Sequence, residues 1–149
     1  MRGAKIDAAK TELIRAIKEL PKEVYFDVIA FDNTVRVWRP ELVAADEQAK
    51  RVAANVVLEQ PLKFKTASYD ALEAAFGLNP EAIYFLSDGA PFGGKIDDPK
   101  TIISTISEIN RVRRVSIHAI GVATNLSSIL ESFMKGLAAA NWGIYKPVN

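Results

Sequence analysis

The sequence predicts an α/β fold of three layers, with helices on both faces of a doubly wound, mainly parallel sheet that has one antiparallel edge strand. Segments with helical spacing of apolar residues alternate with short apolar segments along most of the chain. Residues 83–86 have no polar side chain on either face, as expected of a strand covered by helices on both sides. A tight turn at Asp32-Asn33 joins two β-rich segments and predicts an antiparallel hairpin.

Length and composition indicate one ordinary globular domain. The chain has 149 residues, enough to bury a core. Its net charge of +1 gives no electrostatic reason to expect a nucleic-acid or membrane-surface partner. It has no cysteine, which excludes disulfides and thiol chemistry. We expect no signal peptide and no transmembrane segment in this chain. The cellular compartment is unknown from the sequence.

Helix and strand signals place the elements in order. Asp46 is expected to cap a helix, and Asp98 is expected to cap another, with Pro99 at its first position. The basic cluster Arg111-Val112-Arg113-Arg114 suits the cationic end of that second helix. Helices are expected over residues 4–20, 46–58, 68–76, 99–109 and 126–140, and strands over residues 24–31, 34–38, 83–87, 115–122 and 143–148.

Nucleotide binding is one possible function, and it rests on the loop of residues 89–95. Gly89-Ala90-Pro91-Phe92-Gly93-Gly94-Lys95 fits the G-x-x-x-x-G-K spacing and follows a strand, as a phosphate loop does. However, Ile96 replaces the hydroxyl residue that would hold magnesium. Asp97 and Asp98 place negative charge where phosphate would bind, and Pro99 starts the helix too late to cradle it. We interpret the match as coincidental. A small α/β enzyme or nucleotide-binding domain that uses this loop is the alternative reading.

Catalysis has little support elsewhere in the chain. His118 is the single histidine and lies in an apolar strand segment, where a hydrogen-bonded core residue is more common than a catalytic base. No serine in a nucleophile-elbow sequence accompanies it. Asp7, Asp27 and Asp32 are not spaced as an acid–base pair. We therefore expect that the protein is not an enzyme.

Motifs along essentially the whole chain resemble the von Willebrand factor type A (vWA) domain family. Their order and spacing make the resemblance specific. The family's second and third strands resemble Phe26-Asp27-Val28-Ile29-Ala30-Phe31-Asp32 followed by Val35-Arg36-Val37-Trp38, and its Thr-x-x-x-x-Ala-Leu segment resembles Thr66-Ala67-Ser68-Tyr69-Asp70-Ala71-Leu72. Its strand ending in Thr-Asp-Gly resembles Phe85-Leu86-Ser87-Asp88-Gly89. Its next strand resembles Ile117-His118-Ala119-Ile120-Gly121-Val122, and its last helix and strand resemble residues 137–145.

The resemblance implies a sheet of order 3-2-1-4-5-6 and a metal-ion-dependent adhesion site at its carboxyl edge. There, oxygen ligands hold magnesium, and a partner's carboxylate completes the coordination shell. The family's ligands are an Asp-x-Ser-x-Ser motif after the first strand, a threonine in a second loop and an aspartate in a third. The threonine corresponds to Thr66 and the aspartate to Asp88. The Asp-x-Ser-x-Ser motif is absent, and the chain begins as the family does just beyond it. The first, central strand is therefore expected to be missing.

The incomplete ligand set predicts weak metal binding. Two oxygen ligands are too few to hold magnesium against its reluctance to dehydrate. We therefore expect no tightly bound cofactor, and magnesium only if an upstream segment supplies the missing ligands. Lys65 stands where the family commonly has glycine and puts a cation beside the remnant site of Thr66 and Asp88.

The missing strand leaves a vacant position between the strands at 24–31 and 83–87. The two strands could pair directly into a five-stranded sheet. They could instead recruit a strand from a second copy, which would give a homodimer, or from another protein. The chain could also be a truncated gene product. In each case residues 1–149 are expected to form a single vWA-like domain that acts as a protein-interaction module with an unidentified protein partner.

Overall fold

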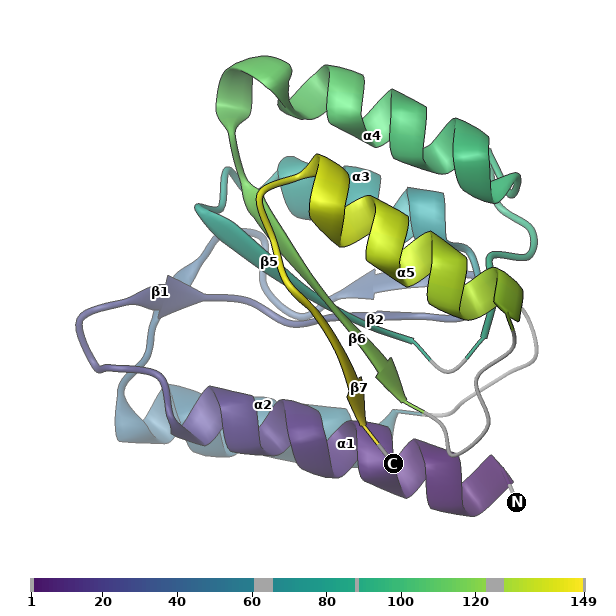
Figure 1. The fold of residues 1–149 in the computed structure, drawn as a ribbon. Helices are drawn as coiled ribbons and strands as arrows, with labels where there is room; N and C mark the ends of the chain where they lie inside the picture. The colour runs from purple at the N-terminus through teal and green to yellow at the C-terminus, as the bar shows by residue number, and fades with distance from the viewer. Residues whose placement is uncertain (1, 61–65, 88, 123–127, 149) are drawn as a thin grey trace.

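The computed structural model describes residues 2–60, 66–87, 89–122 and 128–148. Its helices lie in two layers, one on each face of a parallel sheet (Figure 1). One layer contains α1 (Arg2–Lys18) and α2 (Glu47–Glu59), and the other contains α3 (Ser68–Phe76), α4 (Pro99–Arg113) and α5 (Ser128–Ala140). The three-layer α/β class predicted from the sequence is confirmed.

The parallel sheet has the order β5 (Ala82–Ser87), β6 (Ser116–Val122) and β7 (Tyr145–Val148). Tyr84 lies opposite His118, and Ala119 lies opposite Tyr145. The helices α4 and α5 supply the crossover connections that parallel neighbours need. These three strands lie where the apolar segments at 83–87, 115–122 and 143–148 predicted them.

The remaining strands form two short antiparallel ladders. β2 (Ile29–Phe31) pairs with β3 (Val35–Val37), as the predicted hairpin requires. β1 (Tyr25–Phe26) pairs with β4 (Val43–Ala44), and the sequence did not predict β4 or this ladder. The single strand expected over 24–31 is interrupted at Asp27. Its Oδ1 accepts hydrogen bonds from the N–H groups of Val28 and Arg39, at 2.7 and 3.1 Å. The side chain thus competes with the ladder for backbone donors.

The strands do not form one continuous sheet. Among the described residues no ladder joins β2 to β5, so the direct pairing that would give a five-stranded sheet is not observed. Phe31 of β2 and Phe85 of β5 meet through their side chains instead. Their ring centroids are 5.5 Å apart and their planes differ by 21°.

Each helix layer has its own apolar core. Burial of a large apolar side chain contributes about 2 kcal/mol, so the cores are the main source of stability. The larger core lies between the parallel sheet and α3 to α5, and its fully buried members include Leu72, Ile102, Ile106, Ile117, Leu130, Phe133, Met134 and Leu137. The smaller core lies against α1 and α2 and contains Ile17, Phe26, Val28, Ala45, Ala53 and Val57.

The two predicted helix caps, Asp46 and Asp98, are confirmed, whereas α4 runs to Arg113 and not to 109, and α1 ends at Lys18 and not at 20. Asp46 Oδ1 accepts from the Ala49 N–H at 2.8 Å, and Asp98 Oδ2 accepts from the Thr101 N–H at 3.0 Å. These bonds satisfy donors that the first turn of a helix leaves unpaired. At the other end of α4, Arg114 adopts the left-handed conformation (φ 55°) that terminates the helix.

Two lysines tie α1 and α2 together by reciprocal caps. Lys50 Nζ of α2 donates to the carbonyls of Lys18 and Leu20 at the end of α1, at 3.1 and 2.6 Å. Lys10 Nζ of α1 donates to the carbonyls of Leu58 and Gln60 at the end of α2, at 2.8 and 3.1 Å. Each ammonium satisfies carbonyl groups that have no partner within the helix it caps. It also lies at the C-terminal end of that helix, which is the negative end of the helix dipole.

Candidate functional site

Thr66, one of the two predicted metal ligands, is held firmly at the start of α3. Its N–H donates to the Phe92 carbonyl at 3.1 Å, and its carbonyl accepts from the Phe92 N–H at 2.9 Å. The next residue, Ala67, donates to the Asp32 carbonyl at 2.8 Å. Thr66 is therefore positioned between the end of the β2–β3 hairpin and the loop of residues 89–95.

The Thr66 hydroxyl lies against Gly89. A Cβ added at Gly89 would come within 3.3 Å of Thr66 Oγ1, which leaves little room for any other residue there. Gly89 itself is held at the end of β5 by Ser87, whose Oγ donates to the Gly89 carbonyl at 2.9 Å. The structure thus brings Thr66 beside the residue that follows Asp88. Asp88 and Lys65 lie outside the described residues.

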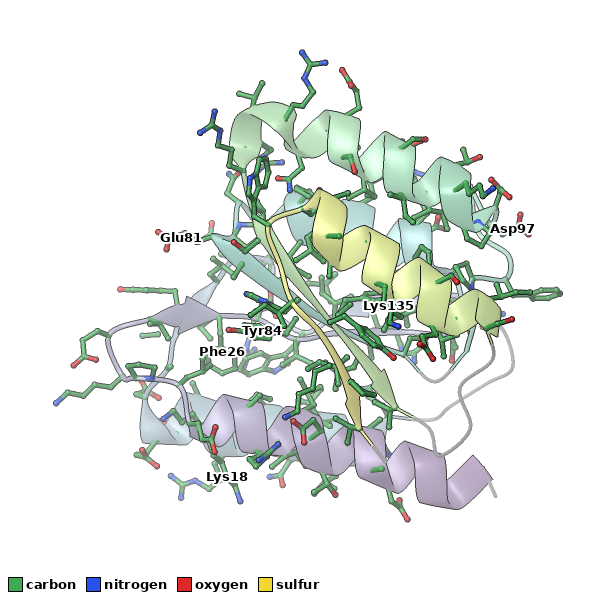
Figure 2. The ribbon with its side chains drawn as sticks, in the orientation of Figure 1. Lys18, Phe26, Glu81, Tyr84, Asp97 and Lys135 are labelled. Carbon is green, nitrogen blue, oxygen red and sulfur yellow. The ribbon has the colours of Figure 1, made fainter. Side chains whose placement is uncertain are left out.

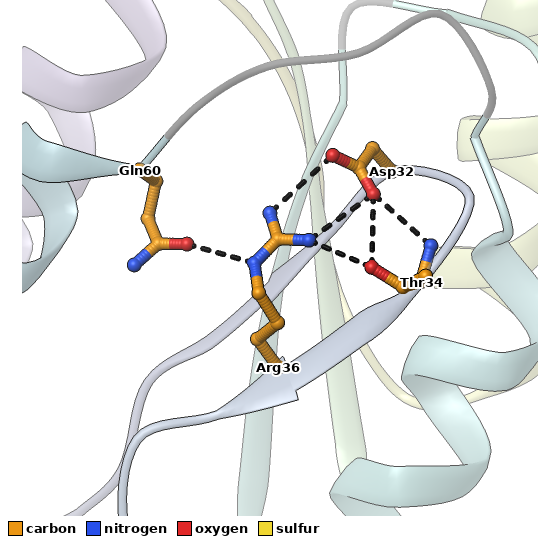
Figure 3. Close-up of polar contacts among 4 residues, drawn as sticks. All are labelled: Asp32, Thr34, Arg36 and Gln60. Carbon is orange, nitrogen blue, oxygen red and sulfur yellow. Dashed lines mark hydrogen bonds and ion pairs between the residues drawn. The ribbon is translucent and has the colours of Figure 1, made fainter.

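Next to Thr66, Asp32 carries a buried carboxylate that is fully occupied by internal contacts (Figure 3). Its Oδ1 accepts from the Thr34 N–H at 3.0 Å and from Arg36 Nη1 at 3.1 Å, and Arg36 Nε also donates to Gln60 Oε1 at 3.0 Å. Burial would raise the pKa of Asp32, but the bonds from Thr34 and Arg36 outweigh it and lower the pKa to about 2. This ionised carboxylate therefore holds the β2–β3 hairpin through Thr34 and Arg36.

The sequence analysis did not identify this Asp32–Arg36 pair. Asp32, Thr34 and Arg36 are alternate residues in the sequence, so on a hairpin they could be expected to share a side of the turn. The contact with Gln60 at the end of α2 joins residues far apart in the chain, and no local signal predicts it.

The loop of residues 89–95 binds carboxylates of its own chain. The Lys95 N–H donates to Asp70 Oδ1 at 2.9 Å, and Lys95 Nζ pairs with Glu73 Oε1 at 2.6 Å. The Gly93 N–H points at Asp97 Oδ2, 3.3 Å away. The hydrogen bond from Lys95 lowers the pKa of Glu73, so this carboxylate stays charged. A phosphate loop needs free N–H donors and positive potential, and this geometry favours neither.

Among the described residues, no group of three or more histidine, cysteine or acidic side chains is arranged to hold a metal ion. Thr66 is therefore without a surrounding set of carboxylates in that part of the chain. Magnesium prefers octahedral oxygen coordination. Whether Thr66 and Asp88 serve as ligands of such an ion stays a prediction, because Asp88 lies outside the described residues.

His118 is a half-buried, hydrogen-bonded strand residue, as the sequence predicted. Its Nδ1 accepts from the Ile144 N–H at 3.2 Å, and its ring stacks on Tyr84 with centroids 5.0 Å apart. Within the described ranges, no acidic side chain forms a hydrogen bond with its ring.

The edge of β5 that faces away from β6 pairs with no strand among the described residues. The Ser116 N–H donates to the Glu81 carbonyl at 3.2 Å. Because successive strand residues direct their backbone N–H and C=O groups to opposite edges, this bond fixes which residues of β5 face β6. The odd-numbered residues therefore direct their N–H and C=O groups toward β6, while Tyr84 and Leu86 direct theirs away from it. Among the described residues β5 pairs with β6 alone.

The edge of β2 is open in the same way. The Trp38 N–H donates to the Val28 carbonyl at 2.9 Å, so Ile29 and Phe31 direct their backbone groups away from β3. The Tyr84 side chain is 56% exposed and lies on the face of the parallel sheet away from α4 and α5 (Figure 2). In the part of the chain that the structure describes, two strand edges are therefore unpaired, and an exposed aromatic residue lies beside one of them.

The chain is similar to proteins that contain this fold. It is 25% identical to inter-alpha-trypsin inhibitor heavy chain H4 of Homo sapiens over all of its own length, which is 17% of that protein. It is 27% identical to heavy chain H1 of Sus scrofa over 76% of its length and 14% of that protein. The chain thus spans less than a fifth of these curated relatives.

Solved structures agree on the fold. A von Willebrand factor type A protein from Catenulispora acidiphila superposes with a TM-score of 0.79 at 20% identity, over 97% of this chain and 34% of that one. The conserved hypothetical protein BatB from Bacteroides thetaiotaomicron superposes with a TM-score of 0.70 at 16% identity, over 97% of this chain and 80% of that one.

The family model described as von Willebrand factor type A domain matches residues 1–146. The resemblance noted in the sequence is confirmed by this match, and no helix in the described residues has the length and apolarity to cross a membrane. The chain belongs to the von Willebrand factor type A domain family.

Proposed function

We propose that this domain is a protein-interaction module that binds its partner without a tightly held metal ion and has no catalytic activity of its own. Family membership supports the general role, because vWA domains are typically modules for adhesion and interaction. The observation on which the specific proposal rests is the unpaired edge of β5, where Tyr84 and Leu86 present backbone donors and acceptors. A partner strand would pair there.

Strand addition suits this edge for two physical reasons. An edge strand with unpaired N–H and C=O groups is a template for another strand, and main-chain hydrogen bonds supply the affinity. The exposed Tyr84 ring lies beside the edge, and large aromatic side chains are common anchors of protein interfaces. In our proposal the strand comes from another protein. A strand from a second copy, which would give a homodimer through the same position, is the other outcome that the experiment distinguishes.

The proposal includes an incomplete metal site. Thr66 and Asp88 remain from the family's ligand set, and the Asp-x-Ser-x-Ser motif is absent from the chain. We expect magnesium titrated into the protein to give no heat of binding in the micromolar range. Micromolar affinity would refute this part, and Thr66→Ala would then show whether the ion lies at Thr66.

A proline substitution tests the strand-addition part. Tyr84→Pro removes an N–H from the open edge while the odd-numbered residues keep their bonds to β6. Tyr84→Thr is the matched control, since it removes the ring but keeps the N–H and suits a strand. We expect the wild-type protein to capture a partner from cell extract in the presence of EDTA. Tyr84→Thr should capture the same partner in reduced amount, and Tyr84→Pro should capture none.

Two readouts decide between the outcomes. Sedimentation that shows a concentration-dependent dimer abolished by Tyr84→Pro would assign the edge to a second copy. Capture that depends on magnesium, or that survives Tyr84→Pro in a variant with unchanged circular dichroism, would contradict the proposal. For the nucleotide-binding alternative, a shift in melting temperature on adding ATP and magnesium, lost in Lys95→Met, would be required.

A further inference from the structure

We propose a second interaction surface, independent of the strand edge: a groove between α1 and α2 that binds an acidic amphipathic helix of a partner protein. The groove has a volume of ≈ 600 Å³. We call it the seam groove. Its walls are formed mainly by Ile14 and Lys18 of α1 and by Lys50, Arg51, Ala54 and Leu58 of α2.

The seam groove combines an apolar floor with an excess of positive charge. Ile14, Ala54 and Leu58 supply apolar surface, and the Leu58 side chain is 57% exposed. Three cations line the groove against a single acid, Glu47. The chain as a whole has a net charge of only +1, so this surplus is local.

Two of these three cations form no hydrogen bond or ion pair with another side chain or carbonyl in the described part of the chain. Lys50 is buried and caps the end of α1, as described above. Lys18 and Arg51 are exposed, and no hydrogen bond or ion pair of their side chains is found among the described residues. Figure 2 shows Lys18 pointing from α1 away from the sheet. Both charges are thus available to a ligand.

A smaller hollow extends the groove along α1. It has a volume of ≈ 340 Å³ and shares Ile14 and Lys18 with the seam groove. Arg15 adds a cation there and Glu19 adds an acid, while Glu12 already pairs with Arg15 at 2.5 Å. The hollow between α1 and α2 thus continues along α1, and such an extended surface fits a third helix better than it fits a compact ligand.

Charge and shape together identify the occupant. An apolar stripe at spacings of three and four residues would cover Ile14 and Leu58, and flanking Asp or Glu residues would face Lys18 and Arg51. Nucleic acid is bound by a broad basic surface and gains nothing from an apolar floor. A membrane takes up apolar side chains that project from a surface, whereas the apolar side chains here line a hollow. The observations therefore favour an acidic helical segment.

The test uses a defined probe and the intact chain. A fluorescein-labelled, helix-forming peptide of about 18 residues carries leucines at i, i+4 and i+7 flanked by glutamates. We expect fluorescence anisotropy to show binding that weakens with salt. We expect Lys18→Glu and Arg51→Glu each to weaken binding about fivefold to tenfold. Lys100→Glu, an exposed charge reversal on α4, is the matched control and should leave binding unchanged.

Three results would overturn the proposal. One is equal binding of a peptide in which the leucines are replaced by glutamine, because it would reduce the contact to non-specific charge. Another is equal loss of binding in Lys100→Glu. The third is tighter binding of phosphatidylserine vesicles or of duplex DNA than of the peptide at the same salt concentration. Tyr84→Pro should still bind the peptide, which separates this surface from the proposed strand edge.

Discussion

Asn110 lies at a junction of the larger core, and its removal should destabilise the whole domain. The side chain is fully buried. Its Nδ2 donates to the Val115 carbonyl at 2.7 Å and to Asn141 Oδ1 at 3.0 Å, and its Oδ1 accepts from the Val115 N–H at 2.7 Å. These bonds join the end of α4 to the start of β6 and to the end of α5.

The expected cost follows from these contacts. Asn110→Ala deletes three hydrogen bonds, each with a net contribution of about 1 kcal/mol. It also leaves the N–H and C=O of Val115 without these partners in a residue that is only 2% exposed. Unsatisfied buried groups cost about 1–3 kcal/mol each, which is a second estimate of the same loss and not an addition to it. We therefore expect the free energy of unfolding to fall by about 3–5 kcal/mol, which corresponds to a lower melting temperature by about 10 °C.

Urea unfolding followed by circular dichroism measures this change. Asn55→Ala is the matched control, because Asn55 is exposed on α2 and alanine favours helix; its stability should be unchanged or slightly higher. Amide exchange at Val115 should accelerate in Asn110→Ala if the mechanism is correct. A loss of less than about 1 kcal/mol would refute the reasoning, since it would mean that water or a rearranged backbone satisfies Val115 at no cost.

The other predictions concern charge. Because the pKa of Asp32 is lowered to about 2, below its usual value, its ionisation stabilises the fold above about pH 4, and this contribution is lost as the pH falls toward 2. Acid-unfolding curves should show about 2 kcal/mol of such pH dependence, and Asp32→Asn should remove it; an unchanged curve would contradict the assignment. Lys50→Met keeps the aliphatic stem but loses the cap on α1, and we expect unfolding to become easier by about 2 kcal/mol. Lys10→Met, at the more exposed reciprocal cap, should lower the free energy of unfolding by less than half as much. Equal effects of the two substitutions would contradict the view that the burial of Lys50 makes its cap the stronger one.

Much of the fold was predictable because its signals are local. The helices α2 and α4 begin where Asp46 and Asp98 cap them, and their apolar residues recur every three or four positions. Both features can be recognised within a short stretch of sequence. β5 and β6 of the parallel sheet are short, mainly apolar segments, and their position between the helix patterns along the chain identifies them as strands. The two-residue strand β4 is too short to give a pattern.

The errors arose where side chains compete with the backbone or where distant segments meet. Asp27 interrupts the strand expected over 24–31 by accepting from N–H groups on both sides of the hairpin. The reciprocal caps of Lys10 and Lys50 depend on how α1 and α2 lie against each other, which no short window of sequence contains. Thr66 lies beside Gly89, and the prediction that Thr66 and Asp88 are metal ligands remains a prediction.

The open edge of β5 is the central claim, and amide hydrogen exchange tests it most directly. In the dilute protein alone, we predict fast exchange for Tyr84 and Leu86, whose N–H groups point away from β6, and slow exchange for Ile83 and Phe85, whose N–H groups point toward it. Added partner, or self-association at high concentration, should slow Tyr84 and Leu86 selectively. Equal protection of all four amides in the dilute protein would show that the edge is already covered and would contradict the account.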